Sequence, residues 1–265
     1  MSTPIKPLDL SDSVNETIKN VSTPLAKSIG TTLADCWYLV FGGLSYAAEK
    51  KRLQYSRELD VFKDELSAKI EAIPNEKTLE PDFQIVTQAL DASKYCLSKS
   101  ELRHMFSSLI ANTMHSDYTN YISATFPNIL RQMNSYDAKL FNYIRNFTCR
   151  PIVDYVKRDE NGLRTLCPNI TVVQEPFLNF ELQSLSLSSL SFLGLVAFSY
   201  SKEATGLTDA YYDLEHNAYI ESLKSKYQDT NNTVITSRGI CQITSLGQSF
   251  AKICLDPEQF PPFFV

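Results

Sequence analysis

The chain has few of the residues and none of the short motifs that mark the commonest enzyme active sites. Its 265 residues include eight glycines and three histidines. We find no glycine-rich phosphate-binding loop, no dinucleotide-binding fingerprint, no nucleophile elbow and no His-Glu-x-x-His helix motif. The sequence therefore predicts no cofactor and no metal, and it favours a protein that is not an enzyme. A catalytic site assembled from distant residues is the alternative left open.

Cysteine spacing and charge indicate a cytoplasmic protein that does not depend on nucleic acid. The six cysteines are scattered, without a Cys-x-x-Cys pair, which is typical of reduced and buried thiols. The N-terminal sequence MSTPIKPLDLSDSVNET lacks the basic and apolar regions of a signal peptide. The formal net charge is −5 at pH 7, whereas nucleic-acid-binding proteins use lysine and arginine to neutralise phosphates. Nucleic acid is therefore not favoured as a partner.

The most apolar stretch, Leu33–Ala48, is shorter than a membrane-spanning helix. It contains Asp35 and a Gly42-Gly43 pair, and a membrane span needs about 20 predominantly apolar residues. We expect a buried helix or a helical hairpin that carries Trp37. Contact of this stretch with a membrane surface is the less favoured alternative.

The first half of the chain has the periodicity of amphipathic helices. Apolar residues recur at spacings of three and four. Proline interrupts the pattern after Ile73 and after Glu80, because proline disfavours the helical conformation of the residue before it. We predict a mainly α fold in which a helical domain occupies residues 1–134. Its parts are an apolar helix at 31–48, a long helix at 49–73 and a helical core at 82–134.

The second half predicts a small α+β module, winged-helix-like, over residues 135–265. Short β-rich runs alternate here with helical patterns, and Asn161-Gly162 is a turn signal between the first two strands. The expected elements are strands at Ile152–Val156 and Ile170–Val173, helices at Leu185–Tyr200 and Tyr211–Tyr227, a hairpin at Val234–Thr244 and a helix at Leu246–Leu255.

In a winged helix with this order of helices and strands, the helix at Tyr211–Tyr227 would read DNA and the hairpin around Arg238-Gly239 would be the wing. The module, however, contains 11 lysines and arginines against 14 aspartates and glutamates. A DNA-reading surface is normally basic. We therefore expect the module to contact protein, and keep a winged-helix DNA-binding regulator as an alternative.

One predicted helix carries a stripe of polar side chains opposite its apolar side. Ser98 and Glu101 form a capping-box pattern at its start. The stripe consists of Glu101, His104, Ser108, Asn112 and His115. Its two histidines lie about 16 Å apart along the helix axis at a rise of about 1.5 Å per residue, so they cannot bind one zinc ion. We interpret the stripe as a solvated face or as a polar contact with a neighbouring helix or subunit; acid–base chemistry is the less favoured alternative.

The stretch from Lys69 to Ile144 has residues with the spacing of a known family. The matching residues are Ile73-Pro74, Glu76-Lys77, Glu80-Pro81, Ala89-Leu90, Lys94-Tyr95, Glu101-Leu102-Arg103, Met105-Phe106, Leu109, Ala111, Met114, Asp117, Phe126, Ile129, Arg131-Gln132 and Asp137-Ala138-Lys139-Leu140. With these residues the chain resembles the abortive infection alpha family of bacterial and prophage-borne proteins. Ser123-Ala124 and Thr87-Gln88 stand where the family is expected to have His-Pro and Gly-Pro.

The resemblance implies a role in antiphage defence and supplies no catalytic residues. Four positions of the motif are candidate functional residues without an assigned role: Glu80, Glu101, Arg103 and Asp117. We expect the protein to act through contacts with a protein partner or a phage component, and self-association is left open. The alternatives are the DNA-binding regulator and a membrane-associated effector that uses residues 33–48.

Overall fold

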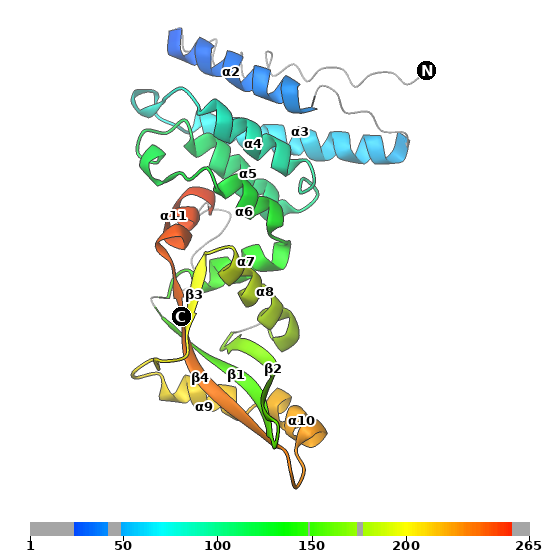
Figure 1. The fold of residues 1–265 in the computed structure, drawn as a ribbon. Helices are drawn as coiled ribbons and strands as arrows, with labels where there is room; N and C mark the ends of the chain where they lie inside the picture. The colour runs from blue at the N-terminus through cyan, green and yellow to red at the C-terminus, as the bar shows by residue number, and fades with distance from the viewer. Residues whose placement is uncertain (1–23, 42–48, 148, 174–176, 256–265) are drawn as a thin grey trace. The chain divides into compact units, whose positions relative to one another are not determined.

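A computed structural model of the chain describes residues 24–41, 49–147, 149–173 and 177–255 (Figure 1). The chain divides into two compact units. The first, called here the helical unit, runs to Ser135 and also includes the segment that begins at Ser249. The second, called the sheet unit, runs from Tyr136 to Gln248. Each unit has a hydrophobic core of its own.

The helical unit is built from helices of the first half of the chain and from the end of the last helix. They are α2 (Pro24–Phe41), α3 (Glu49–Glu71), α4 (Phe83–Ser93), α5 (Ser100–Asn112), α6 (Phe126–Gln132) and the later residues of α11 (Ser245–Cys254). Short 3₁₀ turns lie at Asn75–Lys77 and Thr119–Tyr121. The break after α3 comes at Pro74, and Asp82 begins α4 by accepting a hydrogen bond from the Ile85 amide at 3.0 Å.

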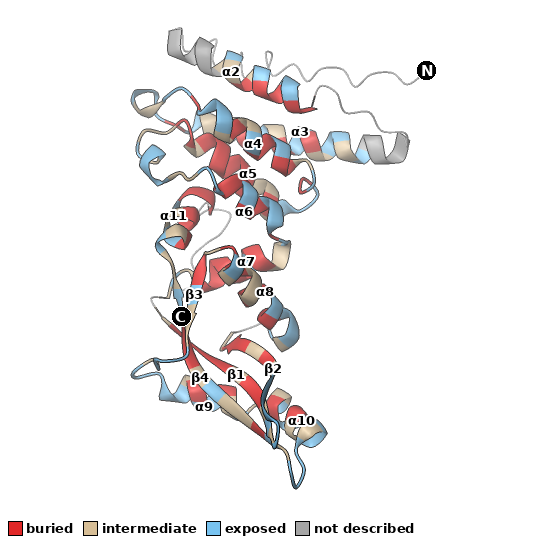
Figure 2. Ribbon diagram, viewed as in Figure 1, coloured by how far each residue is buried: buried red, intermediate tan, exposed pale blue. Residues whose placement is uncertain are grey.

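The core of the helical unit forms where α3 packs on α5 and α4 packs on α2, α5 and α6. Figure 2 shows buried residues along the facing sides of these helices. Trp37 lies on Phe41 and Phe62, with ring centroids 4.6 and 6.0 Å apart. The largest fully buried side chains of this unit are Phe62, Phe106, Phe126, Phe250, Leu90, Leu97, Leu102, Met105 and Leu109.

A four-stranded antiparallel sheet is the centre of the sheet unit. The elements in chain order are α7 (Ser135–Ile144), β1 (Arg150–Asp159), β2 (Gly162–Thr171), α8 (Phe180–Phe192), β3 (Val196–Ser199), α9 (Thr208–Glu215), α10 (Ala218–Tyr227) and β4 (Thr233–Ile243). The strand order is β2-β1-β4-β3. Tyr155 and Tyr211 are both buried in the core of this unit, where residues of α9 and α10 pack against residues of the sheet.

Several sequence predictions are confirmed. The long helix expected at 49–73 is α3, and the helical core expected at 82–134 contains α4, α5 and α6. Strands β1 and β2 meet at the predicted turn, where Gly162 has a φ of 123° that favours glycine. The apolar helix expected at 31–48 begins earlier, at Pro24, and its predicted residues 42–48 lie outside the described ranges.

The prediction of a hairpin at Val234–Thr244 is wrong. This segment is the single strand β4, which pairs with β1 from Thr233 to Cys241. Gly239 serves close packing and not a turn: a Cβ atom there would lie 2.7 Å from the Tyr200 ring and 2.8 Å from the Ser199 carbonyl oxygen. The structure therefore does not confirm the winged-helix arrangement, which required this hairpin as its wing.

Two predicted helices of the same region also differ from the structure. The helix expected at Leu185–Tyr200 ends at Phe192, because Gly194 takes a φ of 76° and Val196–Ser199 pairs with β4 as strand β3. The helix expected at Tyr211–Tyr227 is α9 followed by α10. Asn217 starts α10 by accepting hydrogen bonds from the Tyr219 and Ile220 amides at 3.0 and 3.1 Å.

The capping box predicted at Ser98 does not form, because Lys99 is the N-cap of α5 and makes no side-chain cap bond. No helix in the described ranges combines the length and the hydropathy that a membrane crossing requires.

Candidate functional site

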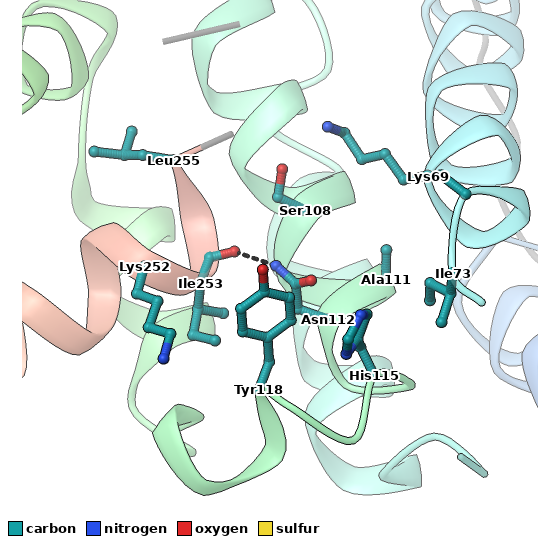
Figure 3. Close-up of a pocket in the computed structure, with 11 residues that line it drawn as sticks. Lys69, Ile73, Ser108, Ala111, Asn112, His115, Tyr118, Lys252, Ile253 and Leu255 are labelled. Carbon is teal, nitrogen blue, oxygen red and sulfur yellow. Dashed lines mark hydrogen bonds between the residues drawn. The ribbon is translucent and has the colours of Figure 1, made fainter. Parts of the chain in front are cut away.

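A pocket of about 260 Å³ lies within the helical unit, and we call it the Asn112 pocket (Figure 3). Its polar lining residues are Lys69, Ser108, Asn112, His115, Tyr118 and Lys252. Its apolar lining residues are Ala72, Ile73, Ala111, Ile253 and Leu255. These residues come from α3 and its end, from α5 and the loop after it, and from α11 and the residue that follows α11.

Helix α5 supplies one wall because its sequence places small and polar residues on one face. Ser108, Ala111 and Asn112 follow at intervals of three and one, which puts them on the same side of the helix, and His115 follows in the loop after it. The opposite side of α5 contributes Leu102, Phe106 and Leu109 to the core. The short side chains of Ser108 and Ala111 leave room for the pocket.

Asn112 ties α5 to the last helix of the chain. Its Nδ2 donates a hydrogen bond to the Ile253 carbonyl oxygen at 2.8 Å, as the dashed line in Figure 3 shows. Nearby, Phe126 and Phe250 meet edge to face, with ring centroids 5.3 Å apart. The wall formed by residues 252–255 is therefore held by both a polar contact and an aromatic contact.

The loop after α5 holds His115 and Tyr118 in place. The Leu79 amide donates to the Met114 carbonyl at 2.8 Å, and the Ser116 amide donates to the Lys77 carbonyl at 2.9 Å. The His115 Nδ1 accepts from the Asp117 amide at 3.2 Å, so the proton of the neutral ring is on Nε2. The rings of His115 and Tyr118 lie 4.7 Å apart between centroids.

The lining of the Asn112 pocket carries positive charge and no carboxylate among the described residues. Lys69 and Lys252 contribute ammonium groups, and the Lys252 Nζ lies 3.3 Å from the centroid of the Tyr121 ring. The nearest carboxylate of the loop, Asp117, is paired with Lys77 at 2.6 Å. A hydrogen bond from Lys77 lowers the pKa of Asp117, and the same bond raises the pKa of Lys77.

The hydroxyl group of Ser108, on the α5 wall of the pocket, is buried and makes no hydrogen bond to the described residues. Its side chain is 4% exposed, and its Oγ has no hydrogen-bond partner among the described residues. The neighbouring Ser107 behaves differently, because its Oγ donates to the His104 carbonyl at 2.9 Å. Buried polar groups are normally paired, so the buried Ser108 hydroxyl is an exception among the described residues.

The polar stripe of α5 is divided between two places. Ser108, Asn112 and His115 line the pocket. His104 instead faces α3, where its Nδ1 lies 3.0 Å from Glu65 Oε2. Glu101, in the first turn of the same helix, is not among the lining residues of the pocket.

The family-motif positions Arg103, Glu80 and Asp117 make contacts with different partners. Arg103 donates from Nε to Glu65 Oε1 at 2.9 Å and from Nη1 to the Leu97 carbonyl at 2.8 Å. Glu80 accepts from Thr32 Oγ1 at 3.5 Å, and Asp117 is paired with Lys77. Two of the four motif positions, Arg103 and Asp117, thus each form an ion pair within the helical unit.

Sequence reasoning missed Lys69, Tyr118 and Lys252 as pocket residues. Lys69 belongs to a charged helix and Lys252 to the other end of the chain, so no spacing rule connects them with α5. The hydrogen bond between Asn112 and Ile253 spans 141 residues, and no local sequence signal predicts a contact of that separation.

Metal ligands and reactive thiols are not gathered in the part of the chain that the structure describes. It contains no group of three or more histidine, cysteine or acidic side chains placed to hold a metal ion. The six cysteines are unpaired. Burial raises the pKa of the Cys241 thiol to about 12 and raises the pKa of Cys254 as well, so both thiols stay protonated near neutral pH.

A family model described as abortive infection alpha matches residues 54–254. The chain belongs to the abortive infection alpha family. The match includes α3 from its second turn, the whole sheet unit and α11, so all six polar residues of the Asn112 pocket lie within the family region. No curated protein and no solved structure matches the chain.

Proposed function

We propose that this protein defends a bacterial cell against phage by abortive infection, in which the infected cell is disabled before phage spread. The observation that carries the proposal is the family match over residues 54–254, which covers most of the 265-residue chain. We further propose that the protein acts through contacts with a protein partner or a phage component.

Exposed apolar side chains on α8 support an action through protein contacts. Leu182, Leu185 and Phe192 are 38, 65 and 84% exposed. At about 100° per residue they lie on one side of the helix, and we call this set the α8 apolar stripe. Aromatic and aliphatic residues exposed together are typical of protein–protein contact surfaces.

Expression of the protein in a susceptible bacterial strain tests the defence role. We expect lower plating efficiency for at least one phage of a broad panel, relative to the same strain without the gene. In liquid culture, cells should survive at low phage multiplicity and collapse at high multiplicity. Indifference of every phage in the panel would contradict the proposed function.

Substitution of the α8 apolar stripe tests the mode of action separately. Leu185→Glu and Phe192→Glu change exposed side chains, so we expect the fold to be kept and protection to be lost. Tyr95→Glu is the matched control, because Tyr95 is 78% exposed on the helical unit and lies outside the stripe. Full protection by the two stripe variants would reject contact through α8 while leaving the defence role intact.

A further inference from the structure

We propose that a second copy of the chain binds to the α8 apolar stripe, so that two α8 helices pack antiparallel about a two-fold axis. We rest this inference on the proposed role of the stripe as a contact surface and name its partner. Three features of α8 carry it: the orientation of the helix, the spacing of its exposed side chains, and its low charge.

Helix α8 buries polar residues while large apolar residues of the same helix stay exposed. Gln183 and Ser186 are 0 and 2% exposed. The Gln183 Oε1 accepts a hydrogen bond from the Thr171 amide at 2.9 Å, and the Ser186 Oγ donates one to Asp137 at 2.6 Å. Because these bonds fix the rotation of the helix, the α8 apolar stripe cannot turn inward without leaving buried polar groups unpaired.

The exposed side of α8 has the spacing of a helix–helix seam. Three apolar residues and one serine follow at intervals of three, four and three: Leu182, Leu185, Ser189 and Phe192. Two helices with these intervals pack at a crossing angle of about 20°.

An identical seam is complementary to this one. When two copies lie antiparallel with the two-fold axis at the level of Leu187, Leu182 faces Phe192 of the second copy. Leu185 then faces Ser189 of the second copy, so a large residue meets a small one. Each residue of the seam thereby has a suitable partner in the same surface, as a two-fold interface requires.

The charge of α8 favours an identical partner in antiparallel order. Glu181 is the only charged residue within α8, so the helix has no pattern of charges with which to select a different protein. In the antiparallel pair the two Glu181 residues lie about 18 Å apart along the axis, at about 1.5 Å per residue. A parallel pair would place the two carboxylates side by side, where like charges repel.

The area of the stripe sets the strength of the dimer. Leu182, Leu185 and Phe192 are 38, 65 and 84% exposed, which amounts to roughly 400 Å² per copy at roughly 200 Å² for a large side chain. Two copies would bury roughly 800 Å² from these side chains alone, against about 1,200–2,000 Å² in stable interfaces. We therefore expect a reversible dimer with a Kd of about 1–100 μM.

Sedimentation velocity of the purified full-length protein tests the proposal without phage or host cells. We expect the mass to rise from the 30.0 kDa of one chain toward twice that value between about 1 and 300 μM protein. Leu185→Glu and Phe192→Glu should each weaken the association at least about tenfold, because each places a carboxylate in the seam. Tyr95→Glu, which changes an exposed side chain of the helical unit, is the control and should associate as wild type does.

Added cysteines test the direction of the two helices. A mixture of the Leu182→Cys and Phe192→Cys proteins should be joined by a short thiol-specific cross-linker, because these positions face each other. Leu182→Cys alone should not be joined, since its two copies lie about 15 Å apart along the axis. The wild-type protein gives the background from the native cysteines, five of which are buried.

A mass of 30.0 kDa over the whole concentration range would overturn the proposal. So would equal association of wild type and both glutamate variants. Cross-linking of Leu182→Cys alone as efficient as that of the mixture would overturn the antiparallel arrangement. The defence role is read out separately: a monomer that restricts phage contradicts the dimer alone, whereas a dimer that restricts no phage contradicts the defence role alone.

Discussion

Glu65 of α3 and Arg103 of α5 form a nearly buried ion pair, with the Glu65 Oε1 2.9 Å from both Nε and Nη2 of Arg103. The side chains are 17 and 14% exposed. His104 Nδ1 adds a contact of 3.0 Å to the other carboxylate oxygen. Arg103 is a family-motif position, and its contacts show it in a structural role that joins two helices of the helical unit.

Removal of the Arg103 guanidinium should destabilise the helical unit. We expect Arg103→Met to lower its free energy of unfolding by about 2–3 kcal/mol, because the Glu65 carboxylate is left without its strongest donor in a poorly hydrated place. Urea unfolding followed by Trp37 fluorescence measures this, since Trp37 is the single tryptophan and is buried in that unit. Arg131→Met, at an exposed arginine of α6, is the control and should change stability by less than about 0.5 kcal/mol.

Lowering the pH should remove the contribution of the Glu65 carboxylate to the stability of the helical unit. Burial alone would raise the pKa of this carboxyl, but the contact with His104 and the hydrogen bond from Arg103 outweigh it and lower the pKa below the usual value of 4.5. A lowered pKa in the folded state gives stability that is present above the unfolded pKa and is lost as the pH falls through the folded pKa. Glu65→Gln should therefore be less stable than wild type at pH 7, and the difference should shrink below pH 4.5.

Trp37 fluorescence in urea series at several pH values measures that difference. We expect the free energies of unfolding of wild type and Glu65→Gln to converge in acid. A constant gap between wild type and Glu65→Gln from pH 7 to pH 3 would show that the ionised carboxylate contributes nothing to the pair.

Gly247 should tolerate no side chain. A Cβ atom at this position would lie 2.1 Å from the Leu195 carbonyl oxygen and 2.9 Å from Ile243 Cγ2. Because a carbonyl of the backbone cannot move aside cheaply, Gly247→Ala should destabilise the sheet unit by about 1–3 kcal/mol. Far-UV circular dichroism in urea measures the loss. Gln248→Ala, at the exposed neighbouring position, should stay within about 0.5 kcal/mol of wild type.

Asn217 has two separable roles in the sheet unit. Its Oδ1 caps α10, while its Nδ2 donates to the Tyr155 hydroxyl at 2.9 Å and to the Leu214 carbonyl at 2.8 Å. Asn217→Ala loses both roles and should cost about 1–2 kcal/mol or more. Asn217→Asp keeps the cap and loses the Nδ2 donors, so its stability should lie between those of the alanine variant and wild type. An aspartate variant as unstable as the alanine variant would show that the cap contributes little.

Local signals in the sequence predicted the features that depend on neighbouring residues. Pro74 marks the end of α3, and the Asn161-Gly162 turn joins β1 and β2. The polar stripe of α5 was also visible, because it follows from helical periodicity alone. These features need no knowledge of the rest of the chain.

Features that depend on distant packing were not predictable. Gly239 suggests a turn in the sequence, yet it lies inside β4 because the Tyr200 ring and the Ser199 carbonyl occupy the space of a side chain. The same limit applies to the Asn112 pocket. Two of its six polar residues, Ser108 and Asn112, come from α5, but Lys69 and Lys252 reach it through folding contacts that no local pattern specifies.

Counting infective centres beside surviving cells tests most directly whether the protein defends by disabling the infected cell. Cells with and without the gene are infected at high multiplicity with a phage that the gene restricts. The account predicts that few infected cells release phage and that few of them form colonies. Recovery of most infected cells as colonies would contradict abortive infection and indicate a block that spares the cell.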